Sequence, residues 1–524
     1  MSRLHPGRRL SPIRVLVALV LLSGLAGAGV MGAQRWASAQ VTTSEDPWFA
    51  GYVDATATPT FAFENPAGDA AQDVVLSFIV ASSDDECEPT WGDAYSLDEA
   101  SEALDLDRRI ARLQQRGGGI AVSFGGLTND ELASVCTDDA DLLNAYRDVV
   151  DRYEVTTIDL DIEGDDLEDE RGGERRADAI AALQEERRGS GKDLAVWLTL
   201  PVGTFGLTEE GTTFVRQMLE AGVDVAGINA MTMNFGQSRD ADESMADASI
   251  RALTQTHRQL GVLYELTGTE LSDATLWRKI GATPMLGQND LEDEVFELDD
   301  ARRLNEWATQ TGLGRMSVWS LNRDVSCGPN YVDLTRVSDA CSGIDQGDER
   351  FAELLGEDFD GRAMFSAGRV TTPEPKDPSE FVDDPETSPY PIWAEESSYL
   401  KGTKVVWHRN VYEAKWWTKG ELPDDPVLNE WETPWTLIGP VLPGEKPIET
   451  PTLPEGTYPE WDGLAPYEKA DRVLFEGVPY EAKWWNEGES PEAYSSDPDS
   501  SPWIPLTADQ IEELVEEAEA GEDG

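Results

Sequence analysis

The feature that most constrains the fold is a repeated alternation of short apolar runs and longer charged segments between residues 48 and 324. The runs have strand length and are rich in β-branched and aromatic residues. They lie at 48–53, 73–80, 119–124, 157–163, 194–200, 225–233, 282–287 and 315–321. Strands that alternate with helix-length segments form parallel sheets, and eight such units form a (β/α)8 TIM barrel. The sequence therefore predicts an α/β barrel domain over 42–358.

The segments between the runs carry apolar residues at helical spacing among Glu, Arg, Ala and Leu. We expect helices at 98–115, 139–151, 174–188, 208–222, 245–265 and 300–311. In a barrel of this kind the functional groups lie at the C-terminal ends of the strands.

The composition changes after the barrel. Residues 366–388 are rich in Pro, Asp, Glu and Thr, with little to bury, and we expect a linker over 359–388. Beyond it the block YEAKWW occurs twice, and one constant shift, the one that takes Tyr412 to Tyr480, aligns the aromatic positions of the two copies. The expected organisation is two small all-β modules with a linker between them and an acidic tail. Module 1 spans 389–440, the second linker 441–457, module 2 458–506 and the tail 507–524.

The N-terminus has the pattern of an export segment. An arginine-rich start precedes an apolar run at 15–33 and the small residues Ala37, Ser38 and Ala39. This order predicts a signal peptide at 1–40, and because the run is long enough to cross a bilayer, an uncleaved anchor is the alternative. Either way the rest of the chain faces an oxidising exterior, so we expect a secreted protein.

Four cysteines, Cys87, Cys136, Cys327 and Cys341, allow three pairings, and no CxxC or His cluster accompanies them to suggest zinc. We expect Cys87 to pair with Cys136 and Cys327 with Cys341, as structural bridges between loops.

The net charge of −61, from 102 acidic and 41 basic residues, repels phosphate backbones and anionic lipid headgroups. We therefore expect no nucleic-acid partner. The sequence indicates no cofactor, no metal and no obligatory protein partner, and we expect a monomer.

The fourth predicted strand carries three alternating acids, Asp159, Asp161 and Glu163. Alternate residues of a strand share a face, so these carboxylates point to the barrel interior while the residues between them pack outward. Carboxylates held close together raise at least one pKa, and a protonated acid is what cleavage of a glycosidic bond requires. The alternatives are ordinary solvated acids in a very acidic chain or a site for a hard cation.

At these residues the chain resembles glycoside hydrolase family 18, whose signature is DxxDxDxE. Four other segments of the chain also match family motifs, and all occur in the order that the family has. Ser123 to Gly126 is similar to SxGG, Met231 to Gly236 resembles the MxYD segment, Gly287 to Asp290 resembles the GQND of a bacterial and archaeal branch, and Trp319 matches the tryptophan at the floor of the cleaved-sugar subsite.

The resemblance implies a retaining, substrate-assisted hydrolysis in which the sugar's own 2-acetamido oxygen attacks the anomeric carbon. It implies that Glu163 protonates the leaving oxygen and later activates water, that Asp161 orients the acetamido group, and that Asp159 tunes the charge on Asp161. The substrate-binding residues that it implies are Ser123, Met231, Met233, Asn234, Gln288, Asp290 and Trp319. Met231 and Trp319 are equally compatible with ordinary barrel core.

Two departures from the family pattern affect these assignments. Thr156 stands where the fuller motif has its first Asp. Met233 and Asn234 replace the Tyr and Asp of many relatives, so we expect Gln288 or Asp290 to contact the acetamido group instead.

The repeats resemble the small family 5/12 chitin-binding modules, whose AKWW block is present in both copies. The candidate sugar-binding residues are Trp416, Trp417, Trp484, Trp485, Tyr412 and Tyr480. Flat aromatic faces with polar edges suit pyranose rings, although a domain this small also needs aromatics for its core. We expect at least one tryptophan of each pair to be exposed.

Together these resemblances predict a secreted chitinase that acts on chitin and chito-oligosaccharides. The alternatives are a chitin lectin with an inactive barrel and an endo-β-N-acetylglucosaminidase acting on glycoprotein glycans. The intact Glu163 argues against the lectin, and the duplicated chitin-binding module argues against the glycan-specific enzyme.

Overall fold

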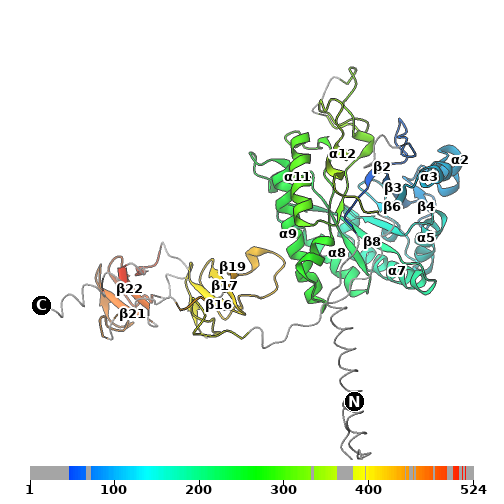
Figure 1. Cartoon of the computed structure of the whole chain (residues 1–524). Helices are drawn as coiled ribbons and strands as arrows, with labels where there is room; N and C mark the ends of the chain where they lie inside the picture. Colours follow the sequence, from blue (N-terminus) through cyan, green and yellow to red (C-terminus); the bar gives the residue numbers. More distant parts are fainter. Residues whose placement is uncertain are drawn as a thin grey trace, which may run out of the picture. The chain divides into compact units, whose positions relative to one another are not determined.

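The chain forms two compact units, Met1–Pro375 and Lys376–Gly524. The computed structural model describes residues 46–65, 72–331, 336–362, 382–395, 397–442, 444–447, 453, 456–475, 478–491, 500–506, 510–511 and 514. The first unit is a sheet surrounded by helices, and the second contains two small β domains (Figure 1). The predicted signal peptide at 1–40 lies outside the described residues. Within the described ranges, no helix combines the length and the apolarity needed to cross a bilayer.

Parallel strands form the centre of the first unit. Their bounds are β1 Trp48–Phe49, β2 Gly51–Asp54, β3 Asp73–Ala81, β6 Gly119–Gly125, β7 Thr157–Asp161, β8 Ala195–Gly203, β10 Val225–Met231, β11 Ile280–Ala282 and β14 Arg315–Met316. From β3 to β14 each strand pairs in parallel with the next in this order, β1 pairs with β14, and β2 pairs with β3. Only Ala50 separates β1 from β2, so the segment 48–54 connects the two ends of the series and the pairings follow a ring.

The last two strands of this ring are shorter than expected. The predicted strands 282–287 and 315–321 correspond to β11 and β14, which end at Ala282 and Met316. Pro284 has no N–H for a ladder bond and follows β11 closely, and only a single bridge, Met285 to Trp319, continues the pairing.

Helices cover the outside of this sheet (Figure 1). They are α2 Leu97–Ala103, α3 Leu106–Gln115, α4 Leu132–Val135, α5 Asp139–Arg152, α6 Asp165–Glu168, α7 Glu170–Gly189, α8 Glu209–Glu220, α9 Met245–Leu266, α10 Asp273–Arg278, α11 Leu298–Thr311 and α12 Phe351–Gly356. All six predicted helical segments are confirmed, but 98–115 is divided into α2 and α3, because Asp105 adopts a left-handed φ of 51°. Side-chain caps from Asp138, Thr208 and Ser244 start α5, α8 and α9.

Short strands and turns extend the loops between these elements. They are β4 Pro89–Trp91, β5 Tyr95–Ser96, β9 Gly206–Leu207, β12 Gly287–Gln288, β13 Val295–Phe296, η1 Gly236–Ser238 and η2 Leu321–Arg323. The described part of the segment between β2 and β3 contains no helix, so the first strand lacks the helix that an ideal barrel unit would have.

The barrel domain extends beyond the predicted boundary at residue 358. Phe359 is buried, the N–H of Gly361 donates to the carbonyl of Pro47, and Arg362 Nε donates to both carboxylate oxygens of Asp73 at 3.0 Å. A side chain at Gly361 would collide with backbone oxygens, so this residue is fitted closely to the barrel. The prediction of a linker that begins at residue 359 is therefore wrong, because residues 359–362 pack on the barrel.

The two repeats fold alike. Module 1 contains β15 Ser398–Tyr399, β16 Lys404–Trp407, β17 Asn410–Ala414, β18 Thr418–Lys419, η5 Glu430–Glu432 and β19 Trp435–Pro440. Module 2 contains β20 Pro466–Tyr467, β21 Arg472–Phe475, β22 Val478–Ala482, β23 Asn486–Glu487 and β24 Trp503–Pro505. The first residues of corresponding strands are separated by the same constant shift that aligns the two sequences, so the sequence duplication is also a structural one.

Each module has one small aromatic core. That of module 1 consists of Trp393, Tyr399, Val405, Tyr412, Ala414 and Trp435, and the equivalents in module 2 occupy the same places. Tyr412 and Tyr480 are 7% and 4% exposed, so the prediction that they contact sugar is wrong. A domain of this size has few residues with which to fill its centre, and these tyrosines serve that purpose.

Module 1 also begins earlier than residue 389. The carboxylate of Asp383 accepts hydrogen bonds from the backbone N–H groups of His408 and Arg409, at 2.9 and 2.6 Å. The residues described before 389 are thus attached to the module, and the rest of the predicted linker, 363–381, lies outside the described residues.

Both disulfides form as predicted. Cys87 is bonded to Cys136 and Cys327 to Cys341.

Candidate active site

Strand β7 presents its acids to the interior of the sheet. Ile158, Leu160 and Ile162 are fully buried among apolar neighbours, while Asp159 and Asp161 project from the opposite face. Glu163 follows two residues after the strand ends. This alternation agrees with the sequence prediction.

Asp159 is the deepest of the three acids, and all its hydrogen bonds are internal. Oδ2 accepts from the hydroxyls of Tyr52 and Ser123, each at 2.8 Å, and Oδ1 accepts from Thr199 Oγ1 at 2.7 Å and Arg315 Nη1 at 2.6 Å. Asp159 and Arg315 are both 0% exposed, so they form a buried ion pair with its hydrogen bonds satisfied. Arg315 therefore balances the charge of the Asp159 carboxylate, and the carboxylate oxygens are not available to substrate.

Arg315 connects this ion pair to the wall of the barrel. Its guanidinium also donates to Tyr52 Oη at 3.1 Å and to Ser317 Oγ at 2.9 Å, and it lies 5.0 Å from the centroid of the Trp48 ring. Burial, and then the neighbouring Asp159, raise the pKa of Tyr52 well above its ordinary value. Its hydroxyl consequently remains a donor toward Asp159.

Asp161 lies nearer the C-terminal end of the strand than the Asp159–Arg315 ion pair, and unlike Asp159 it is not fully hydrogen-bonded. It is 4% exposed, and its Oδ1 has no hydrogen-bond partner. Burial raises its pKa well above the ordinary value, and the charges of Glu163 and Asp159 raise it further. A buried acceptor without a partner is costly in a folded protein, which makes this oxygen suited to an N–H supplied by a ligand.

Glu163 stands at the C-terminal mouth of the barrel. Burial, followed by the charge of Asp290, raises its pKa to about 7. Gly164 has a φ of 55°, in the left-handed region that favours glycine, and the chain turns there into α6. The glutamate is thus held at the strand end with a proton available near neutral pH.

The loops after β10 and β11 meet opposite Glu163. Asn234 Nδ2 donates to Asp290 Oδ2 at 2.7 Å, and the N–H of Asp290 donates to Asn234 Oδ1 at 3.0 Å. Both side chains are exposed. This reciprocal pair fixes Asp290, whose charge acts on Glu163.

The side chains of Gln288 and Ser123 form hydrogen bonds within the protein. Gln288 is 4% exposed and its Nε2 donates to the carbonyls of Asn289, Leu291 and Glu294, so it holds the loop from inside. Ser123 is 0% exposed and supports Asp159. The prediction that Ser123 contacts substrate is wrong, because its buried hydroxyl is used by Asp159, and the amide nitrogen of Gln288 is likewise used within its own loop.

Trp319 forms an aromatic floor with two residues absent from the sequence predictions. Its indole stacks on Phe78, with ring centroids 5.4 Å apart and an interplanar angle of 24°, and meets Tyr52 edge to face at 6.0 Å. Trp319 and Met231 are half-buried, whereas Met233 is 7% exposed. Trp319 therefore retains an accessible surface at the C-terminal end of the eighth strand position.

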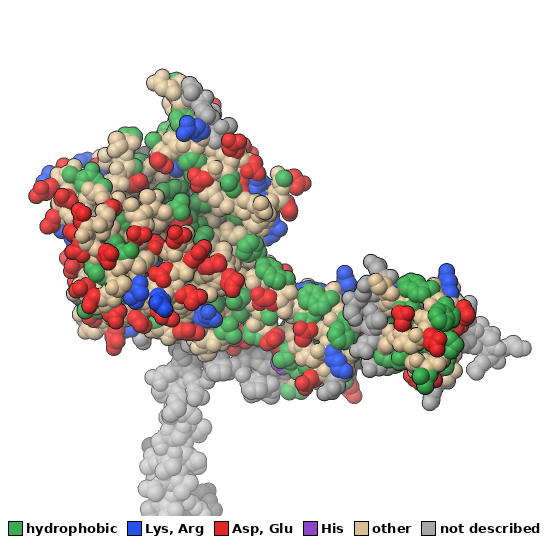
Figure 2. Space-filling view, turned by 180° about the vertical axis from the view of Figure 1, so that it is seen from behind, with side chains coloured by type: hydrophobic (Ala, Val, Ile, Leu, Met, Phe, Trp, Pro, Cys, Tyr) green, Lys and Arg blue, Asp and Glu red, His purple; other side chains and the backbone are tan. Residues whose placement is uncertain are grey.

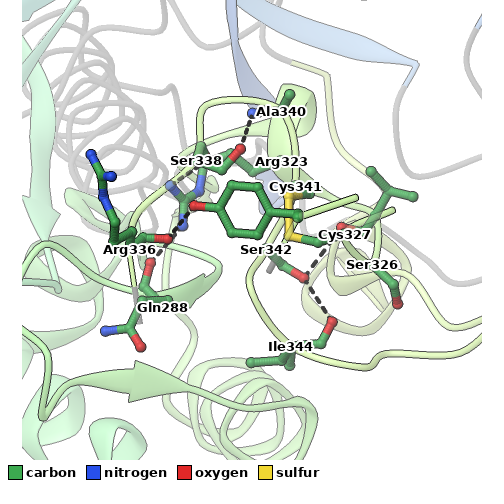
Figure 3. The surroundings of a disulfide bond; sticks show 12 residues. Gln288, Arg323, Ser326, Cys327, Arg336, Ser338, Ala340, Cys341, Ser342 and Ile344 are labelled. Atoms are coloured by element: carbon green, nitrogen blue, oxygen red, sulfur yellow. Dashed lines mark hydrogen bonds between the residues drawn. A yellow bond between two sulfur atoms is a disulfide. The ribbon is translucent and has the colours of Figure 1, made fainter. Parts of the chain in front are cut away.

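Buried Arg323 fastens the loop after β11 to the disulfide-bonded segment that follows the eighth strand position. Its Nη2 donates to the carbonyl of Leu286 at 2.9 Å. Nη2 also donates to the carbonyl of Gln288 at 2.6 Å, and Nη1 donates to the carbonyl of Ser338 at 2.8 Å (Figure 3). The Cys327–Cys341 bridge closes the same segment. Asp290 is thus positioned by a scaffold outside the barrel strands.

The sequence predictions missed Tyr52, Thr199 and Arg315, which complete the site from three other strand positions. The signal was present, because a charged residue such as Arg315 inside an apolar strand requires a buried partner of opposite charge. Strand alternation alone does not identify that partner as Asp159.

The comparisons with known proteins agree with this geometry. The chain is 35% identical over 261 residues to a probable bifunctional chitinase/lysozyme of Escherichia coli, and 33% identical over 256 residues to endochitinase 11 of Metarhizium anisopliae. These matches cover 49% and 48% of this chain, but only 28% and 47% of the relatives' own lengths. No protein-family model matches the chain.

A solved structure extends the similarity to the fold. The catalytic domain of a hyperthermophilic chitinase from Pyrococcus furiosus aligns with a TM-score of 0.51 and 28% identity, covering 62% of this chain and 99% of that domain. The first unit is therefore a glycoside hydrolase domain. Within that class, the relatives and the solved structure named above are chitinases.

Proposed function

We propose that the chain is a secreted chitinase that hydrolyses β-1,4 bonds between N-acetylglucosamine residues, with retention of configuration and with Glu163 as general acid and base. The observation that carries this proposal is that two neighbouring acids have complementary properties, one holding a proton and the other offering a free acceptor. Glu163 has a pKa of about 7 at the mouth of the barrel, and Asp161 carries a buried oxygen that lacks a partner.

The first step transfers one proton and exchanges one bond at the anomeric carbon for another. Glu163 gives its proton to the glycosidic oxygen, the bond to the anomeric carbon breaks, and the sugar's acetamido oxygen bonds to that carbon to give an oxazolinium ion. Asp161 Oδ1, which has no partner in the protein, accepts the acetamido N–H, while Arg315 pairs with Asp159 beneath. In the second step Glu163 takes a proton from water, which attacks the same carbon and restores the acetamido group.

The two modules supply attachment to the polymer. Trp416, Trp484 and Trp485 are 42%, 43% and 55% exposed, in agreement with the expectation of at least one exposed tryptophan in each pair. Two weak sites on one chain increase the occupancy of an insoluble polymer when both engage together. This arrangement favours particulate chitin as the substrate.

The stereochemistry of the first product tests the mechanism. ¹H NMR of a freshly cleaved chito-oligosaccharide is expected to show the β-anomer before mutarotation, and cello-oligosaccharides, which lack the acetamido group, are expected to remain intact. Early appearance of the α-anomer would exclude retention. Cleavage of both substrates at similar rates would exclude participation of the acetamido group.

A further inference from the structure

The two modules expose tryptophans at different positions of the repeat. The first tryptophan of the AKWW block is 42% exposed in module 1 and 43% in module 2. Its neighbour differs, because Trp485 is 55% exposed while Trp417 is half-buried. Module 1 instead exposes Trp431, at 61%.

Lys415 brings Trp431 close to Trp416. Its ammonium lies 5.7 Å from the centroid of the Trp416 ring and donates to the carbonyls of Glu430 and Thr433, which flank Trp431. Trp431 sits on the short turn η5, Glu430–Glu432. One cation therefore supports an indole face and the turn that carries the second indole, so the two rings share one region of the surface.

Module 2 has the equivalent lysine but not the second tryptophan. Lys483 lies 4.7 Å from the centroid of Trp484, but the repeat has Asp499 at the position equivalent to Trp431, and the sequence has no tryptophan between Trp485 and Trp503. Figure 2 shows apolar side chains gathered on the surface of both small domains. Among the described residues, the modules are thus duplicates in fold but differ in which tryptophans they expose.

We propose that module 1 binds a chitin chain through Trp416 and Trp431, whereas module 2 uses Trp484 and Trp485. A neutral polysaccharide of pyranose rings suits an exposed indole face, and the Lys415 ammonium on Trp416 leaves the opposite face of that ring for the ligand. The inference rests on the proposed chitin binding and adds that the two sites are built differently. Module 1 and module 2 therefore present their tryptophans with different spacing to the polymer.

The test uses the full chain with Trp484→Ala and Trp485→Ala, so that adsorption depends on module 1. In this background Trp431→Ala is expected to raise the apparent Kd for insoluble chitin about 5- to 10-fold, the usual effect of truncating an important contact. Trp431→Phe is expected to restore most of the adsorption because it keeps an aromatic face. Leu437→Ala, at a side chain that is 58% exposed in the same module, serves as the control and is expected to change the Kd less than twofold.

The outcomes separate this inference from the proposed function. If Trp416→Ala weakens adsorption while Trp431→Ala does not, module 1 binds chitin without Trp431 and the inference is wrong. If neither substitution affects adsorption, chitin binding by module 1 is also excluded. Hydrolysis of a soluble chito-oligosaccharide, measured in parallel with thermal unfolding, is expected to remain unchanged in every variant and shows that each one is folded.

Discussion

Replacing Glu163 with Gln is expected to stabilise the folded protein at alkaline pH, because the site holds this acid in an environment that disfavours its charge. The pKa is about 7 instead of the ordinary 4.5. A raised pKa means that folding binds the proton, so the contribution to stability is complete below pH 4.5 and is lost as the pH rises through 7. The difference corresponds to about 3 kcal/mol for a fully buried group, and we expect about 2 to 3 kcal/mol because solvent partly reaches this side chain.

The assay is urea unfolding of the wild type and Glu163→Gln at pH 4 and pH 8.5. The free energy of unfolding of the variant relative to the wild type is expected to increase by about 2 to 3 kcal/mol between the two pH values. Glu168→Gln, at an exposed position of α6, controls for general charge effects and is expected to show no such increase. A difference for Glu163→Gln that stays constant with pH would refute the reasoning, since the acid would then ionise like an exposed one.

Three further predictions follow from the site and the modules. Asp290→Asn removes a negative charge that raises the pKa of Glu163, so the alkaline limb of the pH–activity profile is expected to move to lower pH by up to about one unit. Arg315→Met leaves Asp159 as an unpaired buried charge and is expected to lower the free energy of unfolding by about 3 to 5 kcal/mol in urea titrations. Deletion of 389–505 is expected to weaken adsorption to insoluble chitin while soluble oligomers are cleaved at nearly the same rate, and unchanged adsorption would contradict it.

The order of the strands and the place of the acids could be predicted from the sequence because both depend on local patterns. Alternation with a period of two put Asp159, Asp161 and Glu163 on one face, and the regular succession of apolar runs indicated the parallel sheet. The repeat was equally readable, since one constant shift superimposes both the sequences and the strands of the two modules.

The errors have a common physical origin in contacts between residues distant in the chain. Ser123 looked like a ligand for substrate, but its hydroxyl is used by Asp159, and the amide nitrogen of Gln288 is likewise used by carbonyls of its own loop. Tyr412 looked like a sugar-stacking residue, yet the small module needs it for its core. The predicted linker began at residue 359, although Arg362 pairs with Asp73 at the base of the barrel.

The rate of chito-oligosaccharide cleavage by Glu163→Gln at pH 6, compared with the wild type, tests the central claim most directly. The account predicts a fall of at least about 100-fold, the usual contribution of a general acid, while the variant still adsorbs to chitin. A variant that cleaves within a few-fold of the wild-type rate would show that the proton comes from another group.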